Sequence, residues 1–328
     1  MKIIFTVCSM NYLGQAKTLA QSVTENAPEY KFIYGLADKI NNRDLRGISK
    51  TDVLEVADLN IENFEWMVKN YNIVEFATAV KPFYFNYLFQ KYPQATEITY
   101  LDPDIKIFTN LSELSAMHQN YEIILTPHFT KPIRDNKVPT EKHVFNTGIY
   151  NLGFVSMKRG VNTTLLIDWW SNKLKYECIL DLSRGYFVDQ LWMELAPIYF
   201  DNVLVSKHPG MNFAHWNFHE RTATCIDGKY YVNNEPLIFF HFSHYKPSQP
   251  EQLAAFHTRF SFYSRPDLEP LYQKYRTELI ENKYFDFIKE PCFYLRNENL
   301  KKYKKYWSNL IRFLIPVKVK IIFGKYLK

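Results

Sequence analysis

The stretch Ile98-Thr99-Tyr100-Leu101-Asp102-Pro103-Asp104-Ile105 decides the fold of this 328-residue chain. A short apolar strand leads directly into two carboxylates that stand two positions apart. Residues i and i+2 of an extended segment point the same way, so both side chains can face one point. Two close carboxylates repel each other unless a cation lies between them, which predicts a site for Mn²⁺ or Mg²⁺ shared with a phosphate. The alternative is an ordinary turn, for which Asp and Pro are both favoured.

Working outward from this stretch, strand-like and helix-like segments alternate along the chain. The pattern predicts strands at residues 2–7, 31–36, 53–56, 97–101 and 237–240, apolar runs at 121–126 and 148–157, and helices at 11–23, 64–68, 78–89, 165–174 and 189–195. Alternation of this kind predicts an α/β fold with a mostly parallel, doubly wound sheet of Rossmann type. Ligands of such sheets bind beyond the carboxyl ends of the strands, where the paired carboxylates would lie.

The composition excludes several classes of protein. Hydrophobic residues make up 47% of the chain and charged residues 23%, so it can form a core and is not mainly disordered. Its four cysteines lie far apart without a Cys-x-x-Cys pair, which argues against a zinc ribbon or a disulfide framework and for a reducing compartment. We find no signal peptide and no apolar run of about 18 residues. The expectation is a cytoplasmic protein.

The positive charge gathers at the C-terminal end. Residues 300–328 hold nine Lys or Arg and no acid, whereas residues 1–299 hold 31 basic and 34 acidic side chains. A body without excess positive charge argues against a nucleic-acid partner. In the tail, apolar residues recur at three- and four-residue steps beside lysines, which predicts a helical, basic amphipathic extension that docks on an anionic membrane surface. The alternative is a helix that packs on the body, with its lysines in solvent.

Several motifs together resemble the GT-A glycosyltransferases, and family 8 in particular. Besides the strand and its Asp-x-Asp, residues 145–154 look like the Asn-x-Gly strand near the donor sugar, and residues 188–190 like the Asp-Gln beside that sugar. Residues 239–247 resemble the late His…Lys-Pro motif, and residues 7–12 match the first strand and loop, where the base is held. The resemblance covers about residues 2–250. The late motif departs from the family pattern, because Ser243-His244 replaces its small, Gly-containing stretch.

This resemblance implies roles for individual residues. His241 would be the third metal ligand beside Asp102 and Asp104, with His244 as the alternative, and Lys246 would contact the diphosphate. The segment at residues 211–221 resembles one in glycosyltransferases of bacterial surface-polysaccharide clusters; alternatively its Trp packs and its Arg pairs with Glu220. The remaining implied roles are Asp189 and Gln190 beside the reacting carbon; Thr6, Asn11, Tyr12, Asp38, Lys81 and Asn151 for the nucleotide or donor; and Trp216, Asn217, Arg221 and His244 for the acceptor or donor sugar.

The expected function is a metal-dependent glycosyltransferase that uses a nucleotide sugar, a UDP-sugar first of all. Its acceptor would be a glycan or a lipid-linked sugar of a bacterial surface polysaccharide, at the inner face of the membrane, with retention of configuration. We expect a GT-A domain at 1–260, with a nucleotide-binding half at 1–125 and an acceptor half at 126–260, and an extension at 261–328. Two alternatives stay open: a non-catalytic, membrane-docked carbohydrate-binding or scaffold protein with a decayed site, and a sugar-phosphate nucleotidyltransferase.

Overall fold

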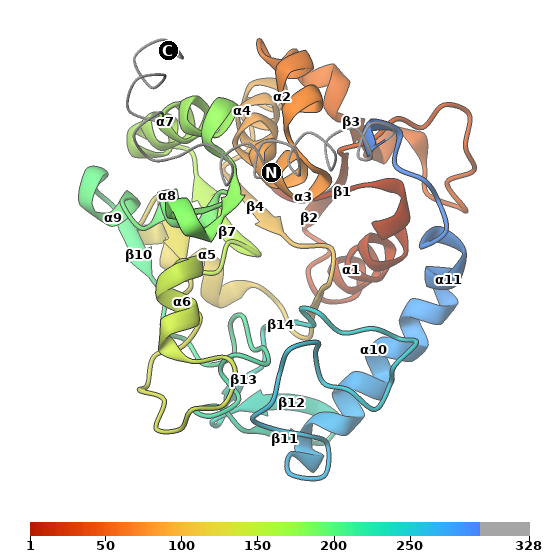
Figure 1. The fold of residues 1–328 in the computed structure, drawn as a ribbon, viewed down its shortest axis with the longest axis vertical. Helices are drawn as coiled ribbons and strands as arrows, with labels where there is room; N and C mark the ends of the chain where they lie inside the picture. Colours follow the sequence, from red (N-terminus) through yellow and green to blue (C-terminus); the bar gives the residue numbers. More distant parts are fainter. Residues whose placement is uncertain (296–328) are drawn as a thin grey trace, which may run out of the picture.

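The computed structural model describes residues 1–295 and has a seven-stranded sheet at its centre, in the order β10-β6-β7-β4-β1-β2-β3 (Figure 1). Adjacent strands are parallel except at β7, which is antiparallel to both β4 and β6. The mostly parallel sheet is therefore confirmed. The strands are β1 (Lys2–Cys8), β2 (Tyr30–Leu36), β3 (Val53–Glu55), β4 (Glu97–Leu101), β6 (Ile123–Leu125), β7 (Phe154–Lys158) and β10 (Val203–Val205).

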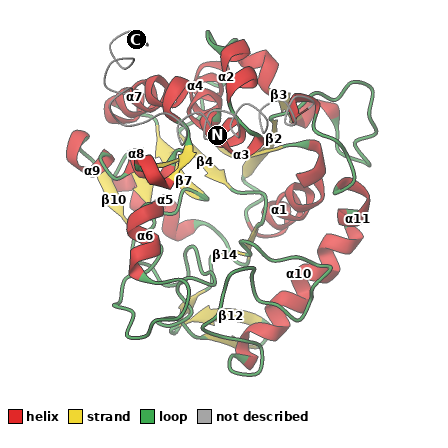
Figure 2. Cartoon of the chain, in the orientation of Figure 1, coloured by secondary structure: helices red, strands yellow, loops and turns green. Residues whose placement is uncertain are grey.

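Helices cover both faces of this sheet (Figure 2). Alternate residues of β1 point to opposite faces: Ile3 and Phe5 join the cluster of α4 and α7, whereas Ile4 joins the cluster of α1 and α5. The doubly wound arrangement is thus confirmed. The helices are α1 (Leu13–Asn26), α2 (Phe64–Asn70), α3 (Ile73–Ala79), α4 (Lys81–Lys91), α5 (Ser112–Asn120), α6 (Glu141–Thr147), α7 (Val161–Glu177), α8 (Gln190–Met193), α9 (Ala196–Tyr199), α10 (Glu269–Glu281) and α11 (Tyr284–Phe287).

Two predicted elements differ from the structure. The helix expected at 78–89 is interrupted, because α3 ends at Ala79 and α4 begins at Lys81, with Pro82 in its first turn. The Asn-x-Gly segment is not a strand: residues 145–147 close α6, and β7 begins only at Phe154. Gly148 adopts a φ of 114°, which a residue with a side chain rarely takes, so the chain turns there instead of extending.

Smaller sheets lie beyond the end of the central sheet that carries the site. β5 (Ile105–Ile107) pairs antiparallel with β14 (Phe239–His241). A second small sheet joins β11 (Ala223–Ile226), β12 (Lys229–Val232) and β13 (Glu235–Pro236), and a third pairs β8 (Leu180–Asp181) with β9 (Tyr186–Phe187). The pairing of β14 with β5 brings the second half of the chain to the strand that follows the Asp-x-Asp turn.

The described part of the C-terminal region is helical and packs on α1. Asn282 donates hydrogen bonds to Thr18 Oγ1 at 3.2 Å and to Gln21 Oε1 at 3.0 Å. A Cβ atom at Gly14 would lie 2.8 Å from the Tyr284 Cα, so glycine permits this close approach. Within residues 1–295, none of the helices has the length and apolar character needed to cross a bilayer. The predicted tail helix at 300–328 lies outside the described residues, and the domain boundary at 260 stays a prediction.

Candidate active site

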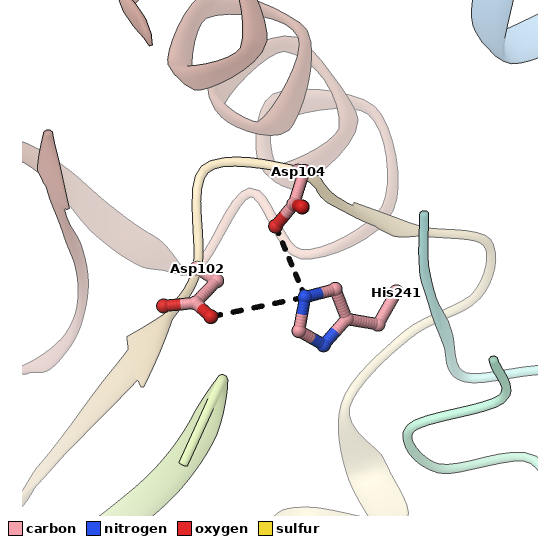
Figure 3. Close-up of side chains that lie close together, drawn as sticks. All are labelled: Asp102, Asp104 and His241. Atoms are coloured by element: carbon pink, nitrogen blue, oxygen red, sulfur yellow. Dashed lines mark ion pairs between the residues drawn. The ribbon is translucent and has the colours of Figure 1, made fainter. Parts of the chain in front are cut away.

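Asp102, Asp104 and His241 converge beyond the end of β4, although the chain separates the two carboxylates from the histidine by more than a hundred residues (Figure 3). The Asp102 N–H donates to the Gly153 carbonyl at 2.8 Å, and the Ile105 N–H donates to the Asp102 carbonyl at 3.0 Å, which closes the turn. His241 pairs with Ile105 across β5 and β14. The imidazole Nε2 lies 3.0 Å from Asp104 Oδ1 and 3.7 Å from Asp102 Oδ2.

This cluster has the chemistry of a divalent-metal site. One ligand atom from each of the three residues lies within 4.8 Å of the others. Two carboxylate oxygens and one imidazole nitrogen suit Mn²⁺, which accepts oxygen and nitrogen ligands. His244, the alternative third ligand, is exposed and is not part of this cluster among residues 1–295. The geometry therefore favours His241.

Charge within the cluster opposes the effect of burial. Burial disfavours ionisation of Asp104, but the facing His241 holds the pKa of this carboxyl below its usual value. Burial likewise disfavours protonation of His241, whereas the two carboxylates raise its pKa. Both shifts follow from the attraction between a protonated His241 and the two carboxylates, so a metal ion that binds here displaces the His241 Nε2 proton.

A hydrogen-bond network fixes the orientation of His241. Asn151 Oδ1 accepts from His241 Nδ1 at 3.2 Å, so the imidazole presents Nε2 to the carboxylates. The same oxygen accepts from Asn212 Nδ2 at 3.1 Å, and His128 Nε2 lies 3.4 Å from the Asn151 amide nitrogen. His128 Nδ1 in turn donates to the Ile149 carbonyl at 3.1 Å. Metal-binding histidines commonly receive this type of outer support.

The sequence did not reveal Asn212 and His128 as parts of the site. Asn212 is fully buried and adopts a φ of 54°, a conformation that asparagine tolerates better than most residues. Asn212 lies within the segment at residues 211–221, but no spacing in the sequence links it to Asn151. Only the three-dimensional meeting of two loops makes the contact visible.

Lys81 and Asp189 form a buried ion pair beside the cluster. Lys81 Nζ lies 2.9 Å from Asp189 Oδ2 and 3.9 Å from Asp102 Oδ1, and it donates to the Leu152 carbonyl at 3.0 Å. Burial opposes its protonation, yet the two carboxylates raise the pKa of Lys81. Burial raises the pKa of Asp189, and Lys81 offsets part of that rise. The predicted donor-site lysine and the predicted catalytic aspartate are thus brought together.

Gln190 supports the loop that contains the Asn-x-Gly segment. Its Nε2 donates to the Thr147 carbonyl at 2.7 Å, and its Oε1 accepts from the Leu152 N–H at 3.1 Å. A Cβ at Gly148 would lie 2.8 Å from Gln190 Cγ, so the glycine makes room for this side chain. Its predicted role beside the reacting carbon stays a prediction.

The four predicted nucleotide residues near the first strand differ in accessibility. Tyr12 is 42% exposed; partial burial and the nearby Asp104 carboxylate raise its pKa, which places it beside the cluster. Asn11 is partly exposed and accepts a hydrogen bond from the Ser9 hydroxyl. Thr6 is fully buried within β1. The first loop can therefore offer Asn11 and Tyr12 to a ligand, but not Thr6 without rearrangement.

Asp38 is completely buried and already has four donors. Its carboxylate accepts from the backbone N–H groups of Met10 at 3.1 Å and Phe293 at 2.8 Å, from the Lys39 N–H, and from Arg43. The observed role is structural, since the carboxylate ties the first loop to the C-terminal segment. Its predicted contact with a ribose or base would require one of these donors to leave.

The predicted sugar-binding segment at residues 211–221 is mostly buried against the rest of the protein. Asn217 is fully buried, and its amide bonds only backbone groups, among them the His128 carbonyl at 3.1 Å. Arg221 donates to the Met211 carbonyl at 2.7 Å and lies 3.5 Å from Glu220, as the packing alternative expects. Burial lowers its pKa to about 10. These two residues hold a loop, so a sugar contact from either would replace existing hydrogen bonds.

The last three predicted residues differ in burial: Trp216 is buried beside the cluster, whereas His244 and Lys246 are exposed. The buried Trp216 ring packs edge-on against His241, with the centroids 5.2 Å apart. His244 is exposed on one side; partial burial of its ring, with His241 and Lys246 nearby, lowers its pKa, and the Asp104 carboxylate opposes this shift. Lys246 is exposed, and its predicted diphosphate contact stays a prediction.

Comparison with known proteins agrees with this geometry. The family model "Glycosyl transferase family 8" matches residues 3–200, more than half of the chain, and the chain belongs to this family. Bacillus subtilis (strain 168) contains two uncharacterized relatives, YfnF and YfnD. YfnF is 26% identical over 84% of this chain and 90% of its own length, and YfnD is 26% identical over 73% and 76%.

Solved glycosyltransferase structures also resemble the chain. The galactosyltransferase LgtC, solved with donor and acceptor sugar analogues, has a TM-score of 0.46 and 14% identity, covering 85% of this chain and 95% of that one. GlyE of Streptococcus pneumoniae TIGR4 has a TM-score of 0.43 and 13% identity, covering 89% and 65%. The family match shows that the protein is a glycosyltransferase.

Proposed function

We propose that this glycosyltransferase transfers a sugar from a UDP-sugar to a glycan or lipid-linked acceptor, with a divalent metal, Mn²⁺ or Mg²⁺, at Asp102, Asp104 and His241. The observation that carries the proposal is the convergence of these three side chains within 4.8 Å at the carboxyl end of β4. When bound there, the ion would neutralise the negative charge that develops on the departing diphosphate. A decayed site would not need the support that Asn151 and Asn212 give to His241.

The residues of this chain contribute separate tasks. Asn151 holds the His241 tautomer that presents Nε2, and the exposed Tyr12 borders the site, next to the partly exposed Asn11 of the same loop. Lys81 holds Asp189 in place and favours its ionised form, because Lys81 Nζ lies 2.9 Å from one of its oxygens. A carboxylate fixed beside the site can stabilise positive charge on the sugar as the leaving group departs.

We propose retention of configuration at the anomeric carbon. No residue in the cluster is an evident base for an acceptor on the opposite face, whereas the family resemblance places Asp189 and Gln190 beside the reacting carbon. Proton NMR of the first product will show the anomeric coupling. An inverted product contradicts this part of the proposal.

The role in bacterial surface polysaccharide synthesis and the docking at the inner membrane face are also proposals. They depend on residues 300–328, whose nine basic side chains and apolar residues suit an anionic surface. Deletion of these residues should abolish co-flotation with phosphatidylglycerol vesicles and leave donor binding intact. Unchanged co-flotation of the truncated protein contradicts the docking.

A screen of UDP-sugars with Mn²⁺ tests the enzymatic proposal. Donor hydrolysis or transfer should disappear in Asp102→Asn and Asp104→Asn while both variants stay folded. Asp227→Asn is the matched control, because Asp227 lies in the exposed turn between β11 and β12, where an Asn-Gly pair is equally favourable. Full activity in either site variant refutes the metal role. If pyrophosphate is added and the UDP-sugar is converted to UTP and a sugar 1-phosphate, the nucleotidyltransferase alternative is favoured.

A further inference from the structure

The loop that follows His241 also forms one wall of a cleft that lies outside the metal cluster. This cleft has a volume of about 530 Å³ and lies between α10 and the loops at 245–251 and 261–263. Such a volume is typical of small-molecule sites. None of the residues to which the family resemblance assigns a role lines it, although Tyr245 lies within the late motif. The cleft is therefore a feature separate from the metal cluster.

Aromatic rings form much of the cleft. Tyr272 of α10 contacts Tyr245 and Phe262 edge-on, with centroids 5.0 and 5.2 Å away. Tyr263 at the opposite loop is 97% exposed. A tyrosine ring offers an apolar face and a polar tip, so an exposed ring beside a cleft suits a ligand with both characters.

Charged groups decide which ligand the rings can receive. Glu251 of the 245–251 loop and Glu269 of α10 line the cleft, and Glu269 also accepts a hydrogen bond from Gln273 at 3.0 Å. Carboxylate oxygens accept hydrogen bonds, so a ligand with hydroxyl donors suits them. Arg276 uses its Nε to hold the Pro247 carbonyl at 3.1 Å. Two carboxylates and one guanidinium disfavour an anionic ligand. A neutral ring that carries hydroxyl groups and one apolar face matches this lining.

The cleft is also joined to the candidate active site. The Phe242 N–H donates to the Asp104 carbonyl at 2.9 Å, and the Phe242 ring stacks on Tyr275 at 3.9 Å and contacts Tyr272 at 5.1 Å. The loop that follows His241 continues through His244 into Tyr245 and the cleft. One wall of the cleft is thus built by the same segment that carries the metal-site histidine.

We propose that this cleft binds a neutral oligosaccharide, the part of the acceptor glycan remote from the reacting hydroxyl. The identification of the ligand as acceptor rests on the proposed function. The cleft itself is tested by saturation-transfer NMR of the full-length protein, without donor or metal, using maltotriose, mannotriose, chitotriose and N-acetyllactosamine. At least one of these probes should receive saturation from the protein.

Matched variants locate the binding. Tyr263→Ala should weaken binding about fivefold or more, whereas Tyr263→Phe retains the ring face and should bind normally. Glu251→Ala should also weaken binding, and Glu281→Ala, at the exposed end of α10 and outside the cleft, should not. Binding that survives Tyr263→Ala and Glu251→Ala overturns the proposal, as does a wild-type protein that binds none of the four probes.

Two further measurements separate this proposal from the proposed function. Asp102→Asn should bind the oligosaccharide as the wild type does, and Tyr263→Ala should bind UDP and Mn²⁺ as the wild type does in calorimetry. Glycan binding that is lost in Asp102→Asn places the ligand in the active site and contradicts the cleft. A wild-type protein that binds the glycan but not UDP with Mn²⁺ refutes the proposed donor and leaves the cleft standing.

Discussion

Replacement of Gly153 by alanine should disable metal binding through a single methyl group. A Cβ at this position would lie 2.4 Å from His241 Cε1, 2.7 Å from His241 Nδ1 and 2.8 Å from Asn151 Oδ1. The first distance is about 1 Å shorter than an ordinary carbon contact. The ring cannot easily retreat, because it is buried and packs against Trp216.

The displacement of the His241 ring determines how much Mn²⁺ affinity the variant should lose. Metal-ligand distances tolerate only about 0.2 Å, so a shift of His241 approaching 1 Å should remove it as a ligand. Loss of outer support alone typically lowers metal affinity by about 10–100-fold, which is the least effect we expect for Mn²⁺. Overpacking should also lower the free energy of unfolding by about 1–3 kcal/mol.

Electron paramagnetic resonance of free Mn²⁺ measures the affinity, with and without UDP, and urea unfolding measures the stability. Gly228→Ala is the matched control. Gly228 adopts a φ of 75° with no atom near its would-be Cβ, so alanine there should cost about 1–2 kcal/mol of backbone strain without touching the site. Wild-type Mn²⁺ affinity in a folded Gly153→Ala variant would refute the geometry described for His241.

Three other perturbations test the surroundings of the site. Lys81→Met should destabilise the protein by about 3–5 kcal/mol in urea, because it leaves Asp189 buried without its cation, and a second change, Asp189→Asn, should recover part of the loss; no loss in the single variant contradicts the ion pair. Burial lowers the pKa of His128 from 6.5 to about 4, so below pH 6.5 the unfolded chain binds the additional proton and stability falls. This group should remove about 2 kcal/mol between pH 7 and pH 5, so the loss measured by urea unfolding should be smaller by that amount in His128→Gln than in the wild type, where His215 and His257 add losses of the same sign. Asp38→Ala should lower the free energy of unfolding by about 1–3 kcal/mol, and it should speed proteolysis near Phe293 because the Phe293 N–H loses this acceptor. Unchanged cleavage rates would contradict the role of Asp38 in holding the C-terminal segment.

The sequence allowed the central part of the fold to be predicted. The strand at 97–101 agrees with β4 residue for residue, and the carboxylates follow it as expected. Both features are local: an apolar run predicts a strand, and an Asp-Pro-Asp turn ends it. The resemblance to family 8 added His241, which no local pattern ties to Asp102.

Other features depend on contacts between distant segments and could not be predicted. His241 reaches the carboxylates because β14 pairs with β5 in the register that sets it opposite Ile105. Asn212 meets Asn151 across two loops. The Asn-x-Gly segment was wrongly expected to be a strand, since Gly148 takes a backbone conformation that an apolar pattern does not disclose.

The contacts of Asp38 also depend on distant segments and could not be predicted. An aspartate that follows a strand in an α/β protein is a reasonable nucleotide ligand, and no pattern in the sequence indicates which donors it has in the structure. One of these donors, the Phe293 N–H, comes from the other end of the described chain. Long-range backbone donors of this kind have no pattern in a single sequence.

The central claim is that His241 joins Asp102 and Asp104 in holding a divalent ion. Electron spin-echo modulation of Mn²⁺ bound to the protein with UDP measures this directly, because a coordinated imidazole couples its ¹⁴N nucleus to the metal. We expect this coupling in the wild type and its loss in His241→Gln. Mn²⁺ that binds the wild-type protein without any ¹⁴N coupling would contradict the account.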